Sequence, residues 1–263
     1  MSPLWRDRLI VGLAPQRLTA IRIGRGLRPR PIRHYEVRLD ADSTTPWRPG
    51  LAAFQELVRD AQWQTPGVDF VLSSDFVRYA VIPGDPNVQS EEERVALGAL
   101  VFRKTFGTLC QDWRITLSEA RKGASTLGAA IPSALIEDLR SGIGKQCRIR
   151  SIRPDLMEAF NRIGEGLKNG PAIFALVESG RVTIGKVADG AWTSIVSRLT
   201  PTDDADALAA VLEEGAALCP FPANAPLWIR DLTGAAVVPA GMSGRVRVVP
   251  ARWPDHPAAT FLA

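Results

Sequence analysis

Residues 172–199, AIFALVESGRVTIGKVADGAWTSIVSRL, contain three apolar stretches separated by two turns that carry glycine. The first turn holds Gly180, and the second is Asp189 followed by Gly190, a pair typical of two-residue β-hairpins. The stretch therefore predicts three antiparallel strands in a row. An Ala- and Leu-rich helix pattern follows directly after a pair of aspartates, which favour a helix start. The expected order is strands over 172–178, 181–188 and 191–199, a helix over 205–218 and a strand over 226–232.

The beginning of the chain shows the same order of elements. Residues 8–13 are apolar, and residues 17–24 and 31–39 alternate between apolar and polar positions, as half-buried strands do. A helical spacing of apolar residues follows over 51–61, just after a proline suited to a helix start. A buried strand is then expected over 68–73. Each unit is thus three strands, a helix and a strand, although the residues themselves do not repeat.

A longer segment separates the two units. Ser90 and Glu93 have the spacing of a capping box, which predicts that a helix begins there. Prolines are placed to open two further helices. After residue 232 about 30 residues remain, which we take as too few for a further strand-and-helix layer on both faces of a sheet. In this segment we expect strands over 76–83, 112–120, 125–131 and 147–153, and helices over 90–107, 132–139 and 154–166.

Composition excludes several classes of protein. The chain has 263 residues, 46% of them hydrophobic and 23% charged, which is ordinary for one or two globular domains and excludes general disorder. No apolar run approaches the roughly 18 residues of a membrane span, and we expect no secretory signal at the start. The two histidines and three cysteines are widely spaced, which argues against a zinc site, a redox pair or histidine-based catalysis. The odd cysteine count suggests reduced thiols.

Positive charge is concentrated near the start. The formal net charge is +4, whereas residues 1–60 alone hold 11 Arg and 6 acidic residues. This excess suggests an anionic partner such as nucleic acid, a membrane surface or an acidic protein segment. Alternatively, the arginines protect the edge of a hairpin from aggregation. The basic run consists of Arg22, Arg25, Arg28, Arg30, Arg33 and Arg38.

The duplicated order resembles a known family. The sequence is similar to the PilM, MshI and cytoplasmic GspL proteins of bacterial type IV pilus and type II secretion assembly, and the similarity rests on residues 68–83, 127–139, 149–164 and 181–190 in that order. The resemblance implies an α/β, duplicated ribonuclease-H-like (actin-like) fold. It places a first lobe over 1–168, a small inserted subdomain over about 76–131 and a truncated second lobe over 169–263.

The resemblance also implies which positions of the chain would bind a nucleotide, so the residues at these positions can be compared with those of actin-like enzymes. Actin-like enzymes hold phosphate and Mg²⁺ with an Asp-x-Gly turn in each of two hairpins. In this chain Gly12 and Ala14 stand where the first turn is expected, and Leu176 and Glu178 mark the second. Glu178 alone cannot replace two positioned acids, so we expect no ATP hydrolysis, no metal and no cofactor. The alternative is a degenerate sugar-kinase-like enzyme that still binds ATP.

Without ATP chemistry, the resemblance implies a scaffold. Its partner would be the cytosolic tail of a PilN-like bitopic inner-membrane protein, held in a groove beside the small subdomain, and an assembly ATPase could be a second partner. The protein would then be cytoplasmic and peripheral to the inner membrane. An extended tail could pair with an exposed strand or lie along the helix that begins at Ser90. The expected contact residues are Phe76, Arg78, Tyr79, Phe102, Arg103 and Phe106, with core packing as the alternative for the phenylalanines.

Overall fold

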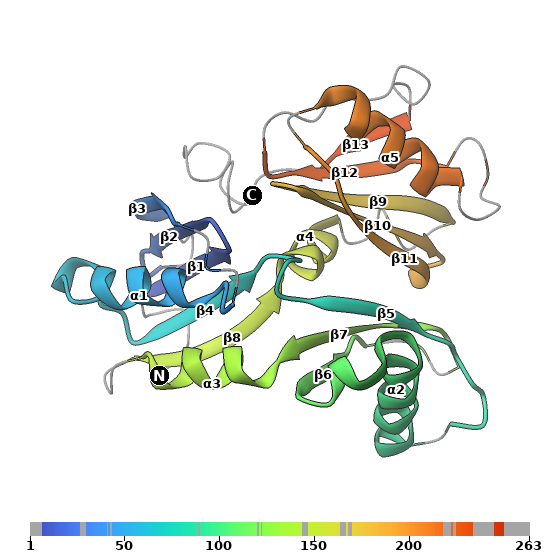
Figure 1. Ribbon diagram of the computed structural model, residues 1–263, viewed down its shortest axis with the longest axis horizontal. Coiled ribbons are helices and arrows are strands. Elements are labelled where there is room, and N and C mark those ends of the chain that lie inside the picture. The colour runs from blue at the N-terminus through green and yellow to red at the C-terminus, as the bar shows by residue number, and fades with distance from the viewer. Residues whose placement is uncertain are drawn as a thin grey trace. The chain divides into compact units, whose positions relative to one another are not determined.

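The computed structural model is shown in Figure 1. It describes residues 7–26, 30–40, 42, 44–88, 90–119, 121, 123–143, 147–163, 167, 170–202, 204–217, 222, 225–233 and 245–249. The described residues fall into two compact units. The first comprises those of Met1–Phe76 and Ser133–Glu158, and the second those of Val77–Pro132 and Ala159–Val249.

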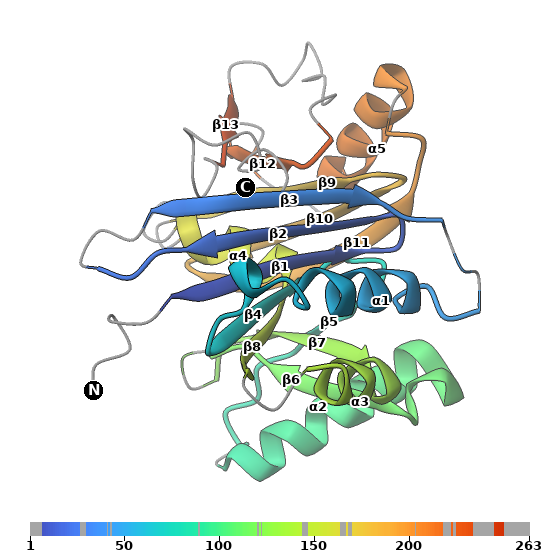
Figure 2. The same cartoon turned by 90° about the vertical axis from the view of Figure 1, so that its left-hand side faces the viewer.

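The first unit contains a five-stranded sheet with the order β3-β2-β1-β4-β8. The first three strands of the chain pair antiparallel, and β1, β4 and β8 pair parallel. Figure 2 shows β3, β2 and β1 side by side. The strands are β1 (Arg8–Ala14), β2 (Arg17–Ile23), β3 (Pro31–Arg38), β4 (Gly67–Leu72) and β8 (Arg148–Pro154).

Helices α1 (Arg48–Leu57) and α3 (Ser133–Ser141) belong to the same unit, with the short 3₁₀ turn η2 (Ala61–Trp63). Phe54 of α1 meets Phe70 of β4 edge to face, with ring centroids 5.2 Å apart. The indole N–H of Trp47 donates to Asp138 of α3 at 2.9 Å, which links the start of α1 to α3. These contacts hold α1 against β4 and against α3.

The second unit contains another five-stranded sheet, with the order β11-β10-β9-β12-β13. Helix α5 (Ala205–Ala217) covers one face, where Leu208 and Leu212 pack on apolar strand residues. On the other face Phe160 of α4 (Asp155–Ile163) packs with Phe174 and Trp192. The strands are β9 (Pro171–Glu178), β10 (Arg181–Ala188), β11 (Ala191–Leu199), β12 (Leu227–Asp231) and β13 (Val246–Val248).

A three-stranded antiparallel sheet, β5-β7-β6, also lies in the second unit. Its helix α2 (Glu91–Phe106) begins with the expected capping box between Ser90 and Glu93, and the 3₁₀ turn η3 (Gly107–Cys110) follows. Phe102 of α2 packs with Ala80, Ile82 and Ala130 of the sheet. We call this element the inserted sheet; it consists of β5 (Arg78–Ile82), β6 (Trp113–Leu117) and β7 (Thr126–Pro132).

The two five-stranded sheets have the same strand order and the same pattern of parallel and antiparallel pairs, which confirms the duplicated α/β fold. The sequence patterns did not predict one short strand after residue 232, β13, which pairs parallel to β12. Three residues are too short for a periodic pattern to identify as a strand. The lobe boundaries expected from the sequence stay a prediction.

Candidate functional site

The first of the two hairpins in which actin-like enzymes hold the nucleotide phosphates joins β1 and β2. Ala14 pairs with Arg17 across a two-residue turn, and Gly12 pairs with Thr19. The turn itself contains Pro15, which has no backbone N–H. The hairpin therefore offers neither a carboxylate in β1 nor a full set of N–H donors to a phosphate.

The second hairpin, between β9 and β10, occupies the same position in the other sheet. Glu178 pairs with Arg181 across a turn with Gly180 at a φ of 75°, so Glu178 corresponds to Ala14 and Leu176 to Gly12. Leu176 is completely buried and Glu178 is 5% exposed. The Asp189–Gly190 turn lies at the other end of β10, where it forms the predicted hairpin with β11.

The six expected contact residues are not gathered on one accessible surface. Phe76 is 3% exposed and meets Trp47 edge to face at 6.5 Å, inside the first unit. Phe102 is completely buried and stacks on Phe106 at 5.6 Å, within the core of the inserted sheet. Tyr79 is 9% exposed. Phe76, Tyr79 and Phe102 are thus buried in this structure, and the burial of Phe76 and Phe102 favours core packing for these two phenylalanines. The contact role expected for all six residues stays a prediction.

The remaining expected residues lie at different places. Arg78 begins β5, and its guanidinium donates to the carbonyl of Val77 at 3.1 Å. Arg103 is exposed on the outer side of α2. Sequence reasoning missed the apolar residues near it, Leu100 (60% exposed) and Val95 (46% exposed). A helix with no continuous apolar stripe gives little signal for which of its residues face solvent.

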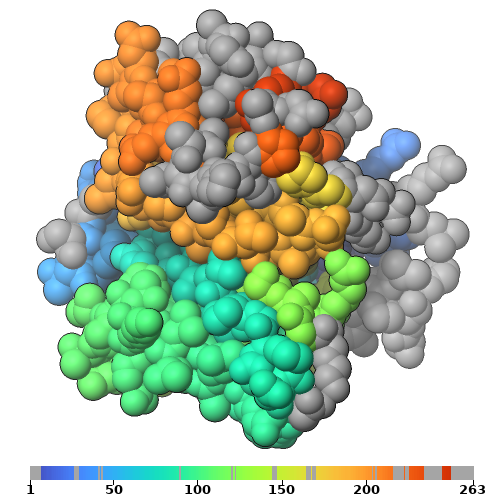
Figure 3. Space-filling view, turned by 90° about the vertical axis from the view of Figure 1, so that its right-hand side faces the viewer, coloured from blue at the N-terminus to red at the C-terminus, as the bar shows by residue number. Residues whose placement is uncertain are grey.

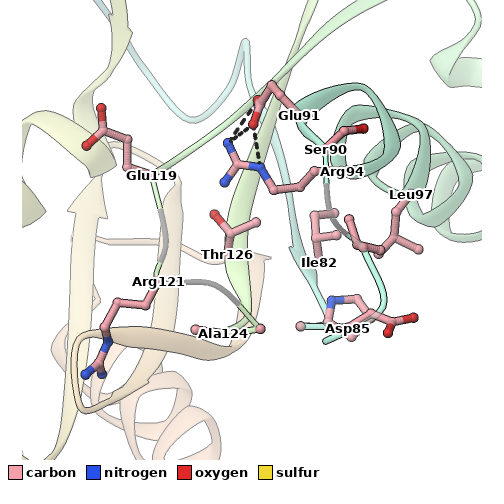
Figure 4. Close-up of a pocket in the computed structure, with 14 residues that line it drawn as sticks. Ile82, Asp85, Ser90, Glu91, Arg94, Leu97, Glu119, Arg121, Ala124 and Thr126 are labelled. Atoms are coloured by element: carbon pink, nitrogen blue, oxygen red, sulfur yellow. Dashed lines mark hydrogen bonds and ion pairs between the residues drawn. The ribbon is translucent and has the colours of Figure 1, made fainter.

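A pocket of about 490 Å³ lies at the end of the inserted sheet, entirely within the second unit (Figure 4). The loop after β5, the start of α2 and the loop between β6 and β7 form it. Its apolar lining includes Ile82, Val88 and Leu97. Carboxylates of Asp85, Glu91 and Glu119 and the guanidinium groups of Arg94 and Arg121 add polar groups. Apart from the capping box, no sequence pattern predicted this pocket, because its walls come from three separate segments.

Charge in the pocket is only partly compensated. Arg94 holds Glu91 through two hydrogen bonds of 2.9 Å, and it also donates to the carbonyl of Ser118 at 3.2 Å. This pairing raises the pKa of Arg94 and lowers the pKa of Glu91. In Figure 4 the Arg121 side chain turns away from the centre, and it donates to the carbonyl of Asp189 at 2.6 Å. The Glu119 side chain also turns away from the centre in Figure 4, and the lining as a whole holds three carboxylates (Asp85, Glu91, Glu119) against two guanidinium groups (Arg94, Arg121).

The described residues were also compared with the requirements of a metal site and of a membrane-spanning helix, and neither adds a candidate functional site. Within the ranges that the structure describes, no three His, Cys, Asp or Glu side chains come together as a metal site. No described helix is both long and apolar enough to cross a bilayer.

Comparison with known proteins adds a fold-level result. No model of a known protein family matches the chain, and no curated protein matches it either. Among solved structures, a Bacteroides thetaiotaomicron protein with an actin-like ATPase fold and unknown function superimposes with a TM-score of 0.56 and 14% identity, over 87% of this chain and 84% of the other. The chain has an actin-like fold.

Two further structures share this fold. The cytoplasmic domain of EpsL, an inner-membrane component of the type II secretion system of Vibrio cholerae, gives a TM-score of 0.56 at 11% identity, over 97% of this chain and 92% of the other. A PilM–PilN type IV pilus biogenesis complex gives 0.61 at 11% identity, over 92% and 88% of the chains. The resemblance expected from the sequence is thereby confirmed at the level of the fold.

Proposed function

We propose that the protein is a non-catalytic scaffold of an inner-membrane platform of the type IV pilus or type II secretion kind. It would act at the cytoplasmic side and bind the cytosolic tail of a PilN-like bitopic membrane protein, with an assembly ATPase as a second partner. The observation that carries this proposal is the likeness to a PilM–PilN complex and to cytoplasmic EpsL over nearly the whole of each chain. Function does not follow from fold alone, so local chemistry must support it.

The two hairpins support the absence of catalysis. Mg²⁺ in a nucleotide site needs carboxylates or other oxygen ligands held open to the phosphates. Gly12 and Ala14 supply none, and Leu176 fills the corresponding position of the second sheet with a buried apolar side chain. Glu178 is the single acid at either hairpin end, and it is almost completely buried.

The pocket of the inserted sheet offers a place for a membrane protein's tail. Cytosolic segments next to a membrane span are enriched in Lys and Arg. A tail with an apolar side chain beside a basic one fits a pocket with Ile82 and Leu97 in its wall and the carboxylates of Asp85 and Glu119 among its lining. We propose docking here in place of the contact expected from the sequence through Phe76 and Phe102, which are buried.

Binding to the tail tests the proposal directly. A fluorescent peptide with the cytosolic tail of the bitopic membrane protein encoded beside this chain should bind the full-length protein in an anisotropy titration. Glu119→Lys should weaken binding, because it reverses the charge at the rim, whereas Glu137→Lys on exposed α3 of the first unit should not. Unchanged binding to the Glu119 variant would place docking elsewhere; no binding by any neighbouring membrane protein would contradict the scaffold.

A thermal-shift measurement separates the scaffold from a degenerate ATP-binding enzyme. A ligand at 100 times its dissociation constant stabilises a protein by about 2.7 kcal/mol. Millimolar Mg-ATP should leave the melting temperature of this protein unchanged. A clear upward shift would favour the enzyme.

A further inference from the structure

Strand β3 forms one edge of the first sheet. It has eight residues, and no strand in the described part of the chain pairs with its outer side. An edge strand carries a row of unpaired backbone N–H and C=O groups, so it can accept a further strand. Natural proteins usually keep such edges short or cover them. A long uncovered edge therefore calls for an explanation.

Arginines flank this edge on both faces of the sheet. Arg33 and Arg38 are five residues apart, so their side chains point to opposite faces. Both are exposed, and among the described residues neither guanidinium has a hydrogen-bond or ion-pair partner. By contrast Arg22, which lies directly opposite Arg33 on β2, is compensated by Asp7 at 2.8 Å. β3 itself carries one acid, Glu36, on the face of Arg38, so the strand keeps a net positive charge.

An apolar side chain lies between these charges and the start of the strand. Ile32, next to Arg33, is 54% exposed. Arginines can protect an edge strand from aggregation, but that role does not explain why an isoleucine is exposed on the same strand. Arg33 also lies directly opposite Arg22, so two positive charges face each other across the strand pair and Asp7 balances one of them. Both features suit a partner that brings negative charge and an apolar side chain.

We propose that the outer edge of β3 binds an extended acidic peptide as an additional strand. The unpaired backbone groups select a polypeptide, since main-chain pairing supplies affinity and the side chains supply specificity. Nucleic acid would need the positive groups along one groove, whereas Arg33 and Arg38 lie on opposite faces. The partner strand alternates between the same two faces, so it reaches both arginines at once.

The geometry specifies a pattern in the peptide. In an antiparallel arrangement, two acidic residues five positions apart lie opposite Arg38 and Arg33. The residue after the second acid then lies opposite Ile32 and should be apolar. A suitable probe is a fluorescein-labelled ten-residue peptide with Glu at positions 3 and 8, Val at position 9 and Thr elsewhere (about the length of the strand plus one residue at each end).

Binding of this probe to the full-length protein, followed by fluorescence anisotropy, tests the proposal. The double variant with Arg33→Glu and Arg38→Glu should bind at least about tenfold more weakly, because two attractive pairs become repulsive. The matched control is Arg148→Glu on β8, the opposite edge of the same sheet, which should bind as the unchanged protein does. A probe with Lys in place of both Glu residues should not bind.

A second measurement uses the unchanged protein and so does not depend on the folding of a variant. Methylating alternate backbone nitrogens of the probe removes donors on one side of the strand. Methylation of the nitrogens that face β3 should abolish binding, whereas methylation of the nitrogens that face away from β3 should preserve it. Equal binding of both methylated probes would overturn the proposal, since charge alone would then hold the peptide. Failure of the acidic probe to bind, with arginine-dependent binding of a single-stranded oligonucleotide or of phosphatidylglycerol vesicles, would overturn it as well.

Discussion

Strands β3 and β11 occupy the same position in two sheets of identical order, yet they have different surroundings. The edge of β11 lies beside β5 of the inserted sheet. Ser125 there donates to the carbonyl of Trp192, and Arg121 donates to the carbonyl of Asp189. Figure 3 shows the green atoms of the inserted sheet meeting the gold and orange atoms of the second sheet. No described strand lies at the outer edge of β3. One edge thus packs against another part of its own unit, whereas no described strand pairs with the other.

The faces of the two sheets differ in the same way. Away from α5, the second sheet carries the ring cluster of Phe160, Phe174 and Trp192. Away from α1, the first sheet carries Asp69, which is 4% exposed and accepts a hydrogen bond from Ser151 at 2.7 Å. Burial lowers the pKa of Arg8 on the neighbouring strand, although Asp69 acts to raise it. The two sheets therefore share a strand order but carry different side chains on the face away from the helix.

The largest expected effect comes from removing the ring that anchors β11. Trp192 is 2% exposed, and its ring lies over Gly185, where a Cβ would approach it to 2.1 Å. Trp192→Ala should lower the free energy of unfolding by about 3–5 kcal/mol, the usual cost of a large core cavity. On β3, Tyr35 is half-buried and meets Trp63 only edge to face at 6.0 Å. Tyr35→Ala should cost clearly less in urea unfolding; equal losses would contradict the difference between the edges.

A smaller effect should follow from Ser151→Ala. The second carboxylate oxygen of Asp69 has no hydrogen-bond partner, so the serine hydroxyl provides the single hydrogen bond of this buried group among the described residues. Leaving a buried acceptor unsatisfied costs about 1–3 kcal/mol. The free energy of unfolding measures the loss. Ser141→Ala serves as the control, because its hydroxyl is exposed on α3. A comparable loss of stability in this control would contradict a particular role for the hydrogen bond between Ser151 and Asp69.

The helix of the inserted sheet, which supports the strand beside β11, should show a loss of about 1 kcal/mol when its cap is removed. The hydroxyl of Ser90 accepts from the Glu93 N–H at 3.1 Å, and the Glu93 carboxylate accepts from the Ser90 N–H at 3.0 Å. Ser90→Ala removes one of these two bonds. Ser179→Ala in the exposed β9–β10 turn should change the stability by less than about 0.5 kcal/mol. Similar melting curves for both variants would argue against a role for the cap.

The smallest effect concerns reactivity at the far edge of the first sheet, where Cys147 precedes β8. Burial raises the pKa of this thiol, although a hydrogen bond with Arg148 acts in the opposite direction. The thiolate is the reactive form, so at about pH 8.5 Cys147 should react more slowly with iodoacetamide than a free cysteine does. The rate should approach that of the free thiol as the pH rises through the raised pKa. Peptide-resolved mass spectrometry measures it, with the urea-unfolded chain as reference; equal rates in the folded and unfolded chain would contradict the burial.

Much of the fold could be predicted from the sequence, because local signals agreed with one another. Alternating apolar residues, the Asp189–Gly190 turn and the capping box at Ser90 each act over a few neighbours, and each lies in the element that it predicted. The end of the chain was harder. β13 has three residues, and it is a strand through its pairing with β12 rather than through a pattern of its own.

The sequence by itself determined the order of strands and helices, the repetition of that order and the lack of an acid at Gly12, since these depend on residues close together in the chain. Tertiary structure decided which side chains a partner can reach. Phe102 and Leu100 are two residues apart on one helix, and packing against the inserted sheet buries the first and leaves the second 60% exposed. It also decided that β11 lies against another strand while no strand in the described part of the chain pairs with the outer side of β3, because such contacts come from residues distant in sequence.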